Sequence, residues 1–184
     1  QTVEVQQELG ALPFRMPVQW VSRPNQDFRG FAGLVASGTI KCGDAIRIAP
    51  SGILSQVEKI VTYDGELAEA CAGQSVTLTL AQEVDVSRGD LLVAADAPPT
   101  VADQLQATLI WMHEEPMLPG RSYLCKLGAR TVAASITALK HKINVNTLEH
   151  LAAATLGLNE VGVCNLGLDR AVAFDPYLEN RDTG

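Results

Sequence analysis

The chain has no cluster of lysine and arginine residues of the kind that binds a nucleic-acid backbone. Its 14 basic residues are outnumbered by 21 acidic ones, which gives a formal net charge of −7. It also has no uninterrupted apolar run of about 18 residues, the length that a membrane-spanning helix needs. Because phosphate binding requires concentrated positive charge, we predict that neither nucleic acid nor a membrane is a partner of this chain.

Sequence motifs for nucleotide hydrolysis, nucleophilic catalysis and metal ligation are also missing. No Gly-x-x-x-x-Gly-Lys-Ser/Thr loop occurs, so this chain alone should not hydrolyse a nucleotide by P-loop chemistry. No Gly-x-Ser-x-Gly elbow surrounds Ser37. The segment from His113 to Glu115 resembles a metal motif, but Pro116 ends any helix that would align its side chains. The sequence therefore predicts no catalytic, cofactor-binding or metal-binding residue.

The four cysteines are far apart, at positions 42, 71, 125 and 164. No Cys-x-x-Cys pair occurs, which argues against a zinc ribbon or a thioredoxin-like site. Unpaired cysteines at such spacing are typical of proteins in a reducing compartment. We predict reduced, mostly buried thiols in a cytoplasmic protein.

What the sequence does contain is a series of short strands separated by glycine turns. Residues 31–36 alternate between two faces, and residues 45–48 resume the alternation around Arg47. Between them, Gly38 and Gly43 supply the backbone freedom for two sharp reversals, and Asp44 accepts backbone hydrogen bonds in the second one. Residues 76–80 form the clearest strand. Short strands at this spacing favour a small closed antiparallel barrel.

Two consecutive prolines, Pro98 and Pro99, mark a division of the chain, because they cannot lie in a central strand and they stiffen a connection. Strand-like alternation continues beyond them. We predict an all-β chain made of two tandem small antiparallel β-barrels, the first covering residues 1–97 and the second residues 98–184. Within the second, residues 146–157 could form one or two helical turns or a loop, because apolar residues recur there at helical spacing.

The sequence from Leu12 to Gly184 resembles one protein family over nearly its whole length. The segment from Asp27 to Gly33, Asp-Phe-Arg-Gly-Phe-Ala-Gly, and the segment from Phe174 to Gly184, Phe-Asp-Pro-Tyr-Leu-Glu-Asn-Arg-Asp-Thr-Gly, carry the resemblance most specifically. The strand-and-turn pattern is similar to domains 2 and 3 of elongation factor Tu. The two longer sequence segments resemble the large, GTPase subunit of bacterial sulfate adenylyltransferase.

This resemblance implies a function that the residues alone do not. In that family, a GTP-binding domain precedes the two barrels and binds GTP and magnesium. A small catalytic subunit makes adenosine 5′-phosphosulfate from ATP and sulfate, and GTP hydrolysis drives the reaction. In some bacteria an adenylylsulfate kinase is fused to the large subunit. The resemblance implies that this chain is the non-catalytic barrel portion, with the catalytic subunit and the parent's own GTP-binding domain as partners.

The connection from Asn25 to Arg29 is our candidate for an interface with the GTP-binding domain or the catalytic partner, with Asn25, Asp27, Phe28 and Arg29 as its residues. A solvated turn remains the alternative. A second functional class also stays open, in which the barrels belong to a translation factor and bind RNA. The family continues beyond Gly184 with further strand sequence, so we expect the second barrel to be truncated, with an exposed edge prone to pairing.

Overall fold

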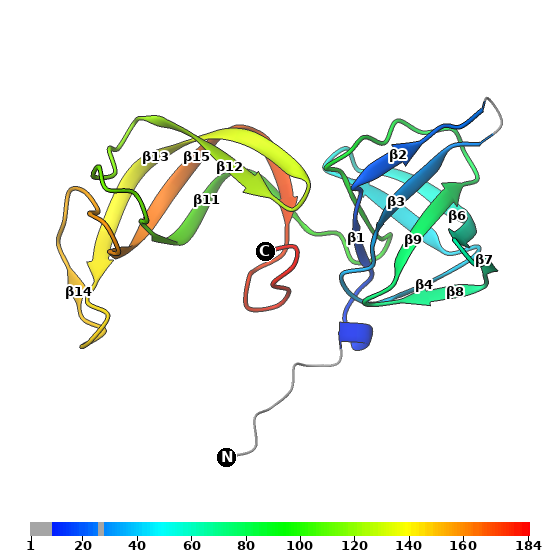
Figure 1. The fold of residues 1–184 in the computed structure, drawn as a ribbon, viewed down its shortest axis with the longest axis horizontal. Coiled ribbons are helices and arrows are strands. Elements are labelled where there is room, and N and C mark those ends of the chain that lie inside the picture. The colour runs from blue at the N-terminus through cyan, green and yellow to red at the C-terminus, as the bar shows by residue number, and fades with distance from the viewer. Residues whose placement is uncertain (1–8, 26–27) are drawn as a thin grey trace, which may run out of the picture. The chain divides into compact units, whose positions relative to one another are not determined.

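The computed structural model of the chain describes residues 9–25 and 28–184. In that part of the chain the secondary structure is one 3-10 turn, Leu9–Ala11, and fifteen strands, without an α-helix (Figure 1). None of its helical segments is long and apolar enough to cross a membrane. The strands pair in curled antiparallel sheets, which confirms the predicted all-β class.

The strands of the first half are β1 (Arg15–Pro17), β2 (Trp20–Ser22), β3 (Gly30–Leu34), β4 (Thr39–Lys41), β5 (Ala45–Ala49), β6 (Ile53–Thr62), β7 (Gly65–Leu67), β8 (Glu69–Cys71), β9 (Ser75–Leu80) and β10 (Leu91–Ala94). Those of the second half are β11 (Thr100–Ile110), β12 (Ser122–Leu127), β13 (Arg130–Ile143), β14 (His150–Leu151) and β15 (Val161–Phe174).

Packing divides the chain into two compact units. The first contains the chain up to Val101 together with Leu127–Arg130 and Val172–Gly184. The second contains Ala102–Lys126 and Thr131–Ala171. The sequence placed all of residues 98–184 in a second barrel, whereas packing assigns the last thirteen of them to the first unit. The barrel boundary after residue 97 itself stays a prediction.

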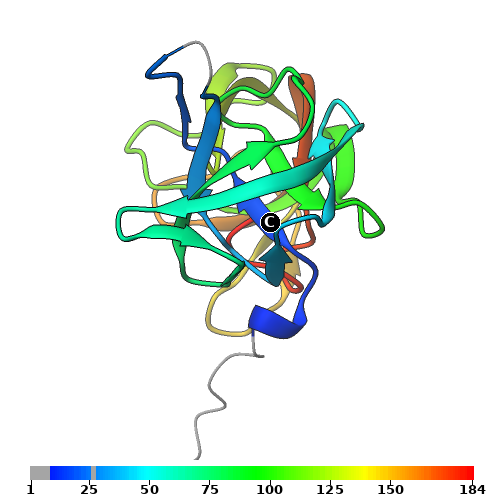
Figure 2. The ribbon, with the colours of Figure 1, turned by 90° about the vertical axis from the view of Figure 1, so that its right-hand side faces the viewer.

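The first unit is an antiparallel sheet that curls around a core (Figure 2). Its strand order is β1-β10-β5-β6-β9-β3-β2, with β7 paired to β6 and a separate β4–β8 pair. An antiparallel bridge joins Arg15 of β1 to Ser37, which follows β3. The amide of Arg15 donates to the Ser37 carbonyl at 3.0 Å, and the Ala36 amide donates to the Arg15 carbonyl at 2.8 Å. These bonds connect β1, at one end of the strand series, with the residues that follow β3.

The core of the first unit is built by alternation, as the sequence predicts. Strands such as β5 and β9 bury alternate apolar residues, and the largest fully buried side chains include Phe31, Ile48, Ile60 and Leu78. Where β3 passes β1, a Cβ on Gly33 would lie 2.3 Å from the Pro17 carbonyl oxygen, so only glycine permits this approach. The two predicted reversals also occur, since Gly38 and Gly43 both have positive φ angles.

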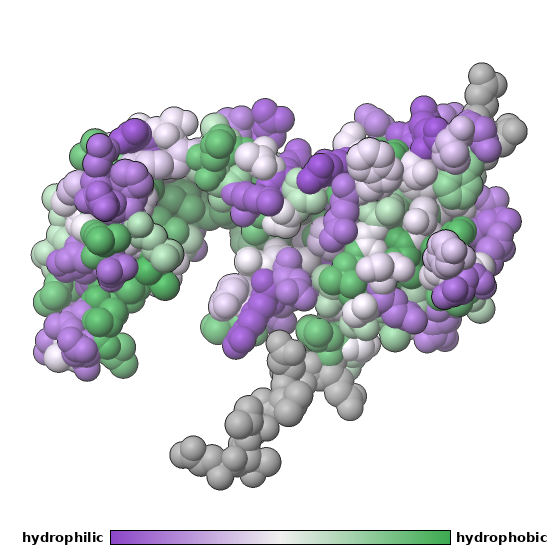
Figure 3. Space-filling model, in the orientation of Figure 1, coloured by the Kyte–Doolittle hydropathy of each residue, from purple (hydrophilic) through white to green (hydrophobic). Residues whose placement is uncertain are grey.

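The second unit is a curled sheet in the order β11-β15-β13-β12, with β14 paired to β13. Two register shifts interrupt the pairing of β13 with β15. Its core is small and contains Met117, Ile136, Leu156 and Cys164, with Trp111 and Tyr123 packed against it. Several large apolar side chains of this unit remain exposed, and Figure 3 shows hydrophobic residues reaching its surface among hydrophilic ones.

The segment that the sequence left open as helical turns or a loop is non-helical. It contains the short strand β14 within turns, and Leu148 has a φ of 60°, outside the helical range. The Asn144 side chain accepts the Asn146 amide at 3.0 Å, which forms a local turn in place of a helix cap. A spacing pattern over so few residues did not distinguish the two outcomes.

The C-terminal segment closes onto the first unit through a buried cluster that we call the C-terminal clasp, made of Arg15, Asp175, Thr183, Asn180 and Ser37. Arg15 donates from Nε and Nη2 to the two carboxylate oxygens of Asp175, at 2.8 and 2.9 Å. The Thr183 hydroxyl donates to the same carboxylate at 2.7 Å. The Asn180 amide donates to the Ser37 hydroxyl at 3.0 Å. All five residues are buried.

Candidate functional site: an arginine-lined cleft

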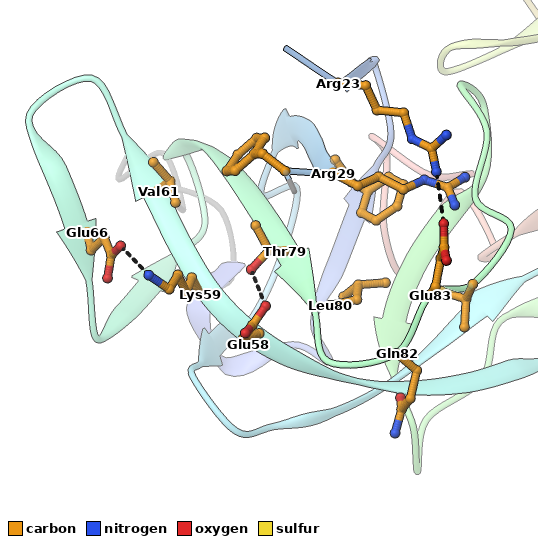
Figure 4. Close-up of a pocket in the computed structure, with 13 residues that line it drawn as sticks. Arg23, Arg29, Glu58, Lys59, Val61, Glu66, Thr79, Leu80, Gln82 and Glu83 are labelled. Carbon is orange, nitrogen blue, oxygen red and sulfur yellow. Dashed lines mark hydrogen bonds and ion pairs between the residues drawn. The ribbon is translucent and has the colours of Figure 1, made fainter. Parts of the chain in front are cut away.

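A cleft of about 480 Å³ opens on the first unit beside the connection between β2 and β3 (Figure 4). It is lined from four directions: the β2–β3 connection, strand β3, the β6–β7 hairpin, and the end of β9 with the residues after it. The lining residues are Arg23, Phe28, Arg29, Phe31, Glu58, Lys59, Val61, Glu66, Thr79, Leu80, Gln82, Glu83 and Val84.

Two of the four residues predicted as an interface, Phe28 and Arg29, line this cleft. Asn25 lies in the same connection but is not among the lining residues, and Asp27 lies outside the described residues. The interface role of this connection stays a prediction. The residues contributed by β6, β7 and β9 could not be found from the sequence, because strand register brings them to the cleft.

Arg29 has the least complete set of partners in the cleft. Its side chain is 24% exposed, and its guanidinium carbon lies 5.4 Å from the centroid of the Phe31 ring. The nearest carboxylate oxygen of the described residues, on Asp85, is 3.7 Å from Nη2, which is too far for a hydrogen bond. The Nε of Arg29 is buried and has no hydrogen-bond acceptor among the described residues. A buried donor without an acceptor is unfavourable.

The other two basic groups of the cleft are paired. Nη2 of Arg23 donates to Oε1 of Glu83 at 3.2 Å. The ammonium of Lys59 donates to Oε1 of Glu66 at 2.8 Å. This hydrogen bond and the charge of Glu66 raise the pKa of Lys59 above its ordinary value, so its positive charge is retained. Dashed lines in Figure 4 mark both pairs.

Phe28 takes its place because β3 begins with glycine. A Cβ on Gly30 would lie 2.7 and 2.9 Å from two carbons of the Phe28 ring and 2.5 Å from Cγ2 of Thr77. The bare backbone of Gly30 therefore lets the ring lie against β3 and β9. This packing makes the Phe28 ring part of the cleft lining.

Groups that resembled catalytic or metal-binding candidates have other roles. The carboxylate of Asp44 accepts the Lys41 amide at 2.8 Å, which confirms its predicted use in a turn. Ser37 donates its hydroxyl to the Pro13 carbonyl at 2.7 Å, within the C-terminal clasp. Nδ1 of His113 accepts the Glu115 amide at 3.0 Å. Within residues 9–25 and 28–184, no three His, Cys, Asp or Glu side chains are grouped to hold a metal ion.

The cysteines are all free thiols, as predicted, but they are not mostly buried. Cys42 directly follows β4 and Cys71 ends β8, and both are exposed. Of the four cysteines only Cys164 is fully buried. Burial raises the pKa of the Cys164 thiol and of the partly buried Cys125 thiol. The error arose because the sequence shows which residues alternate but not which small residues face solvent.

Comparison with known proteins gives the fold and the relatives of this chain. The family described as "GTP-eEF1A C-terminal domain-like" matches residues 104–184. The crystal structure of Sup35 complexed with GMPPNP superposes with a TM-score of 0.85 over 100% of this chain and 45% of that one, at 17% identity. At that identity the match establishes the fold alone.

Sequence relatives are much closer. Sulfate adenylyltransferase subunit 1 of Aeromonas hydrophila is 50% identical over 100% of this chain, which spans 39% of that protein. The bifunctional enzyme CysN/CysC of Xylella fastidiosa is 53% identical over 92% of this chain, which spans 27% of that protein. The predicted resemblance is thereby confirmed over the length of the chain. By sequence, the chain is a homologue of one segment of sulfate adenylyltransferase subunit 1 and its bifunctional relatives.

Proposed function

We propose that this chain is the barrel portion of a sulfate adenylyltransferase GTPase subunit. In that role it couples GTP hydrolysis to the synthesis of adenosine 5′-phosphosulfate from ATP and sulfate during sulfate assimilation. The observation that carries the proposal is the 50% identity to subunit 1 across the whole chain. The chain spans well under half of that relative, so the activity belongs to the larger protein of which such a segment is part.

The partners follow from this proposal. The catalytic small subunit carries the adenylyl-transfer chemistry, and GTP and magnesium are bound by the parent's own GTP-binding domain. The similarity to a bifunctional CysN/CysC enzyme supports an adenylylsulfate kinase fused to the parent chain. The free thiols agree with a cytoplasmic location, where cysteines remain reduced.

A coupling role fits the chemistry of the described residues. Making adenosine 5′-phosphosulfate is strongly uphill, so hydrolysis must change contacts at an interface to drive it. The proposal assigns that contact to the connection from Asn25 to Arg29 and to the cleft beside it. In this proposal the barrels bind their partners and transmit the conformational change, and they need no nucleophile.

The experiment uses the full-length large subunit together with the catalytic subunit. Adenosine 5′-phosphosulfate synthesis is measured with and without GTP. We expect GTP to stimulate the wild-type enzyme. Arg29→Glu should lower the stimulation by about fivefold or more, the factor that corresponds to a typical coupling free energy. Arg88→Glu, an exposed arginine of the same unit outside the cleft, should leave both rates unchanged.

Each result has a separate meaning. A wild-type enzyme that GTP does not stimulate would overturn the coupling function. Equal effects of Arg29→Glu and Arg88→Glu would remove the connection from the interface while leaving the function intact. The translation-factor alternative predicts RNA binding that weakens as salt rises, and the net charge of −7 disfavours it.

A further inference from the structure

The cleft of the first unit contains one strong hydrogen-bond donor that the described chain leaves without an acceptor. Arg29 Nε is buried and unpaired, and it lies in a cleft large enough to admit a side chain of another molecule. A guanidinium presents Nε and a terminal nitrogen side by side, which matches the two oxygens of one carboxylate. The unpaired Nε is one half of that fork.

The carboxylates of residues 9–25 and 28–184 do not fill this position. Among these described carboxylates Asp85 is the nearest, but it is 93% exposed and its closest oxygen is 3.7 Å from Nη2. Glu58 accepts the Thr79 hydroxyl at 3.2 Å. Glu66 and Glu83 are the partners of Lys59 and Arg23. Arg29 is therefore the one basic residue lining the cleft that has no hydrogen-bonded carboxylate in the described part of the chain.

A second arginine, Arg47, also has an Nε that is unpaired in the described chain but does not line the cleft. Arg47 Nε is also buried without an acceptor among the described residues. Its terminal nitrogens, however, donate to the Gly52 and Ala95 carbonyl oxygens at 3.1 and 3.3 Å, and it does not line the cleft. Backbone carbonyls hold the terminal nitrogens of Arg47, whereas Arg29 lines the cleft.

The charge of the cleft selects the ligand. Its lining contains three basic side chains and three acidic ones, so pairing leaves no surplus positive charge for a phosphate dianion. A single carboxylate needs only the free side of Arg29. The Phe31 ring, whose centroid lies 5.4 Å from the guanidinium carbon, supplies an apolar wall for the carbon chain of an acidic residue. Arginine next to an aromatic ring is a common centre of protein interfaces.

We propose that the cleft receives one aspartate or glutamate side chain of a protein partner, whose carboxylate pairs with Nε and Nη2 of Arg29. This inference rests on the proposed function, because it gives the chemistry of the contact between the barrels and the protein to which they couple. The partner's acidic side chain replaces the distant Asp85 as the anion of Arg29.

Nuclear magnetic resonance of the 184-residue chain tests the site with acetate as the carboxylate probe. The Nε–H resonance of Arg29 is followed while acetate replaces chloride at constant ionic strength. We expect a saturable shift at Arg29 and none at Arg47, the internal control with an equally unpaired Nε. Acetamide, which has nearly the same shape without the charge, should produce no saturable shift.

Variants make the outcome decisive. Arg29→Gln should weaken acetate binding by about tenfold or more, while Arg29→Lys, which keeps the charge but not the fork, should weaken it less. Asp85→Asn should strengthen binding, because it removes the nearest competing carboxylate. A non-saturable shift, or equal shifts at Arg29 and Arg47, would overturn the site.

A tighter saturable response to inorganic phosphate than to acetate at equal ionic strength would also overturn the proposal, since it would identify a phosphate ligand instead of an acidic side chain. The acetate titration is independent of GTP and of sulfate. Its failure would therefore leave the coupling function standing, while loss of GTP stimulation in the wild-type enzyme would leave the carboxylate site standing.

Discussion

Replacing Asp175 by alanine should strongly destabilise the first unit, because the C-terminal clasp holds a buried charge in place. The Arg15 side chain is only 6% exposed, and two of its nitrogens donate to the Asp175 carboxylate. Without that carboxylate, the Phe14 carbonyl, at 3.0 Å, is the one acceptor that the described residues still offer to the Arg15 side chain. Removing one partner of a buried ion pair costs about 3–5 kcal/mol. Thr183→Val removes one hydrogen bond to an anion that Arg15 still satisfies, so we expect about 1 kcal/mol.

Urea unfolding followed by tryptophan fluorescence measures this difference unit by unit. Trp20 belongs to the first unit and Trp111 to the second, so a Trp111→Phe background reports the first unit alone. The matched control is Glu69→Ala, which breaks an ion pair with Lys41 whose side chains are 61% and 50% exposed. Such an exposed pair contributes below about 1 kcal/mol. If Asp175→Ala and Glu69→Ala lowered the free energy of unfolding by equally small amounts, the reasoning would be refuted.

Three further outcomes are expected. The Lys142 hydrogen bond lowers the pKa of Glu160 below its ordinary value of 4.5, so the stability it contributes is present above that pH and is lost as the pH falls through the lowered pKa. Glu160→Gln should remove this pH dependence, which we expect to amount to less than about 1 kcal/mol of unfolding free energy because the side chain is 35% exposed. Unfolding at several pH values, followed by Trp111 fluorescence, measures it. Gly30→Ala should destabilise the first unit by about 1–3 kcal/mol, whereas Gly10→Ala, with open space around its Cβ, should be neutral in the same urea assay. Because β11 and β12 are the outer strands of the second sheet, the chain should self-associate at high concentration, and a strictly monomeric sedimentation profile would contradict this.

Alternation and turn chemistry made the strands predictable. The sequence expectation for residues 76–80 corresponds to β9, Ser75–Leu80, in which Val76 and Leu78 are buried. The glycine turns were predictable for the same reason, since a left-handed backbone conformation favours one residue type. These signals are local, because each depends on residues within a few positions of one another.

The clasp and the cleft depend on contacts that no local pattern encodes. Arg15 and Asp175 are 160 positions apart, and neither sits in a motif that predicts a buried ion pair. Arg29 was chosen from its place in a connection, but its unpaired Nε depends on where Phe31 and Asp85 lie after folding. Sequence reasoning therefore proposed the segment as an interface, which stays a prediction, and could not give the contacts within it.

The distribution of satisfied and unsatisfied charges favours a binding role for the first unit over a catalytic one. The clasp pairs its buried charges at hydrogen-bonding distance, so it holds one arrangement firmly. The cleft pairs two of its three basic residues and leaves Arg29 with an unmet donor. Such a donor gains free energy only when another molecule supplies the acceptor. A partner that presents its carboxylate in one state and withdraws it in another would bind the two states with different affinity, and that difference is what coupling requires.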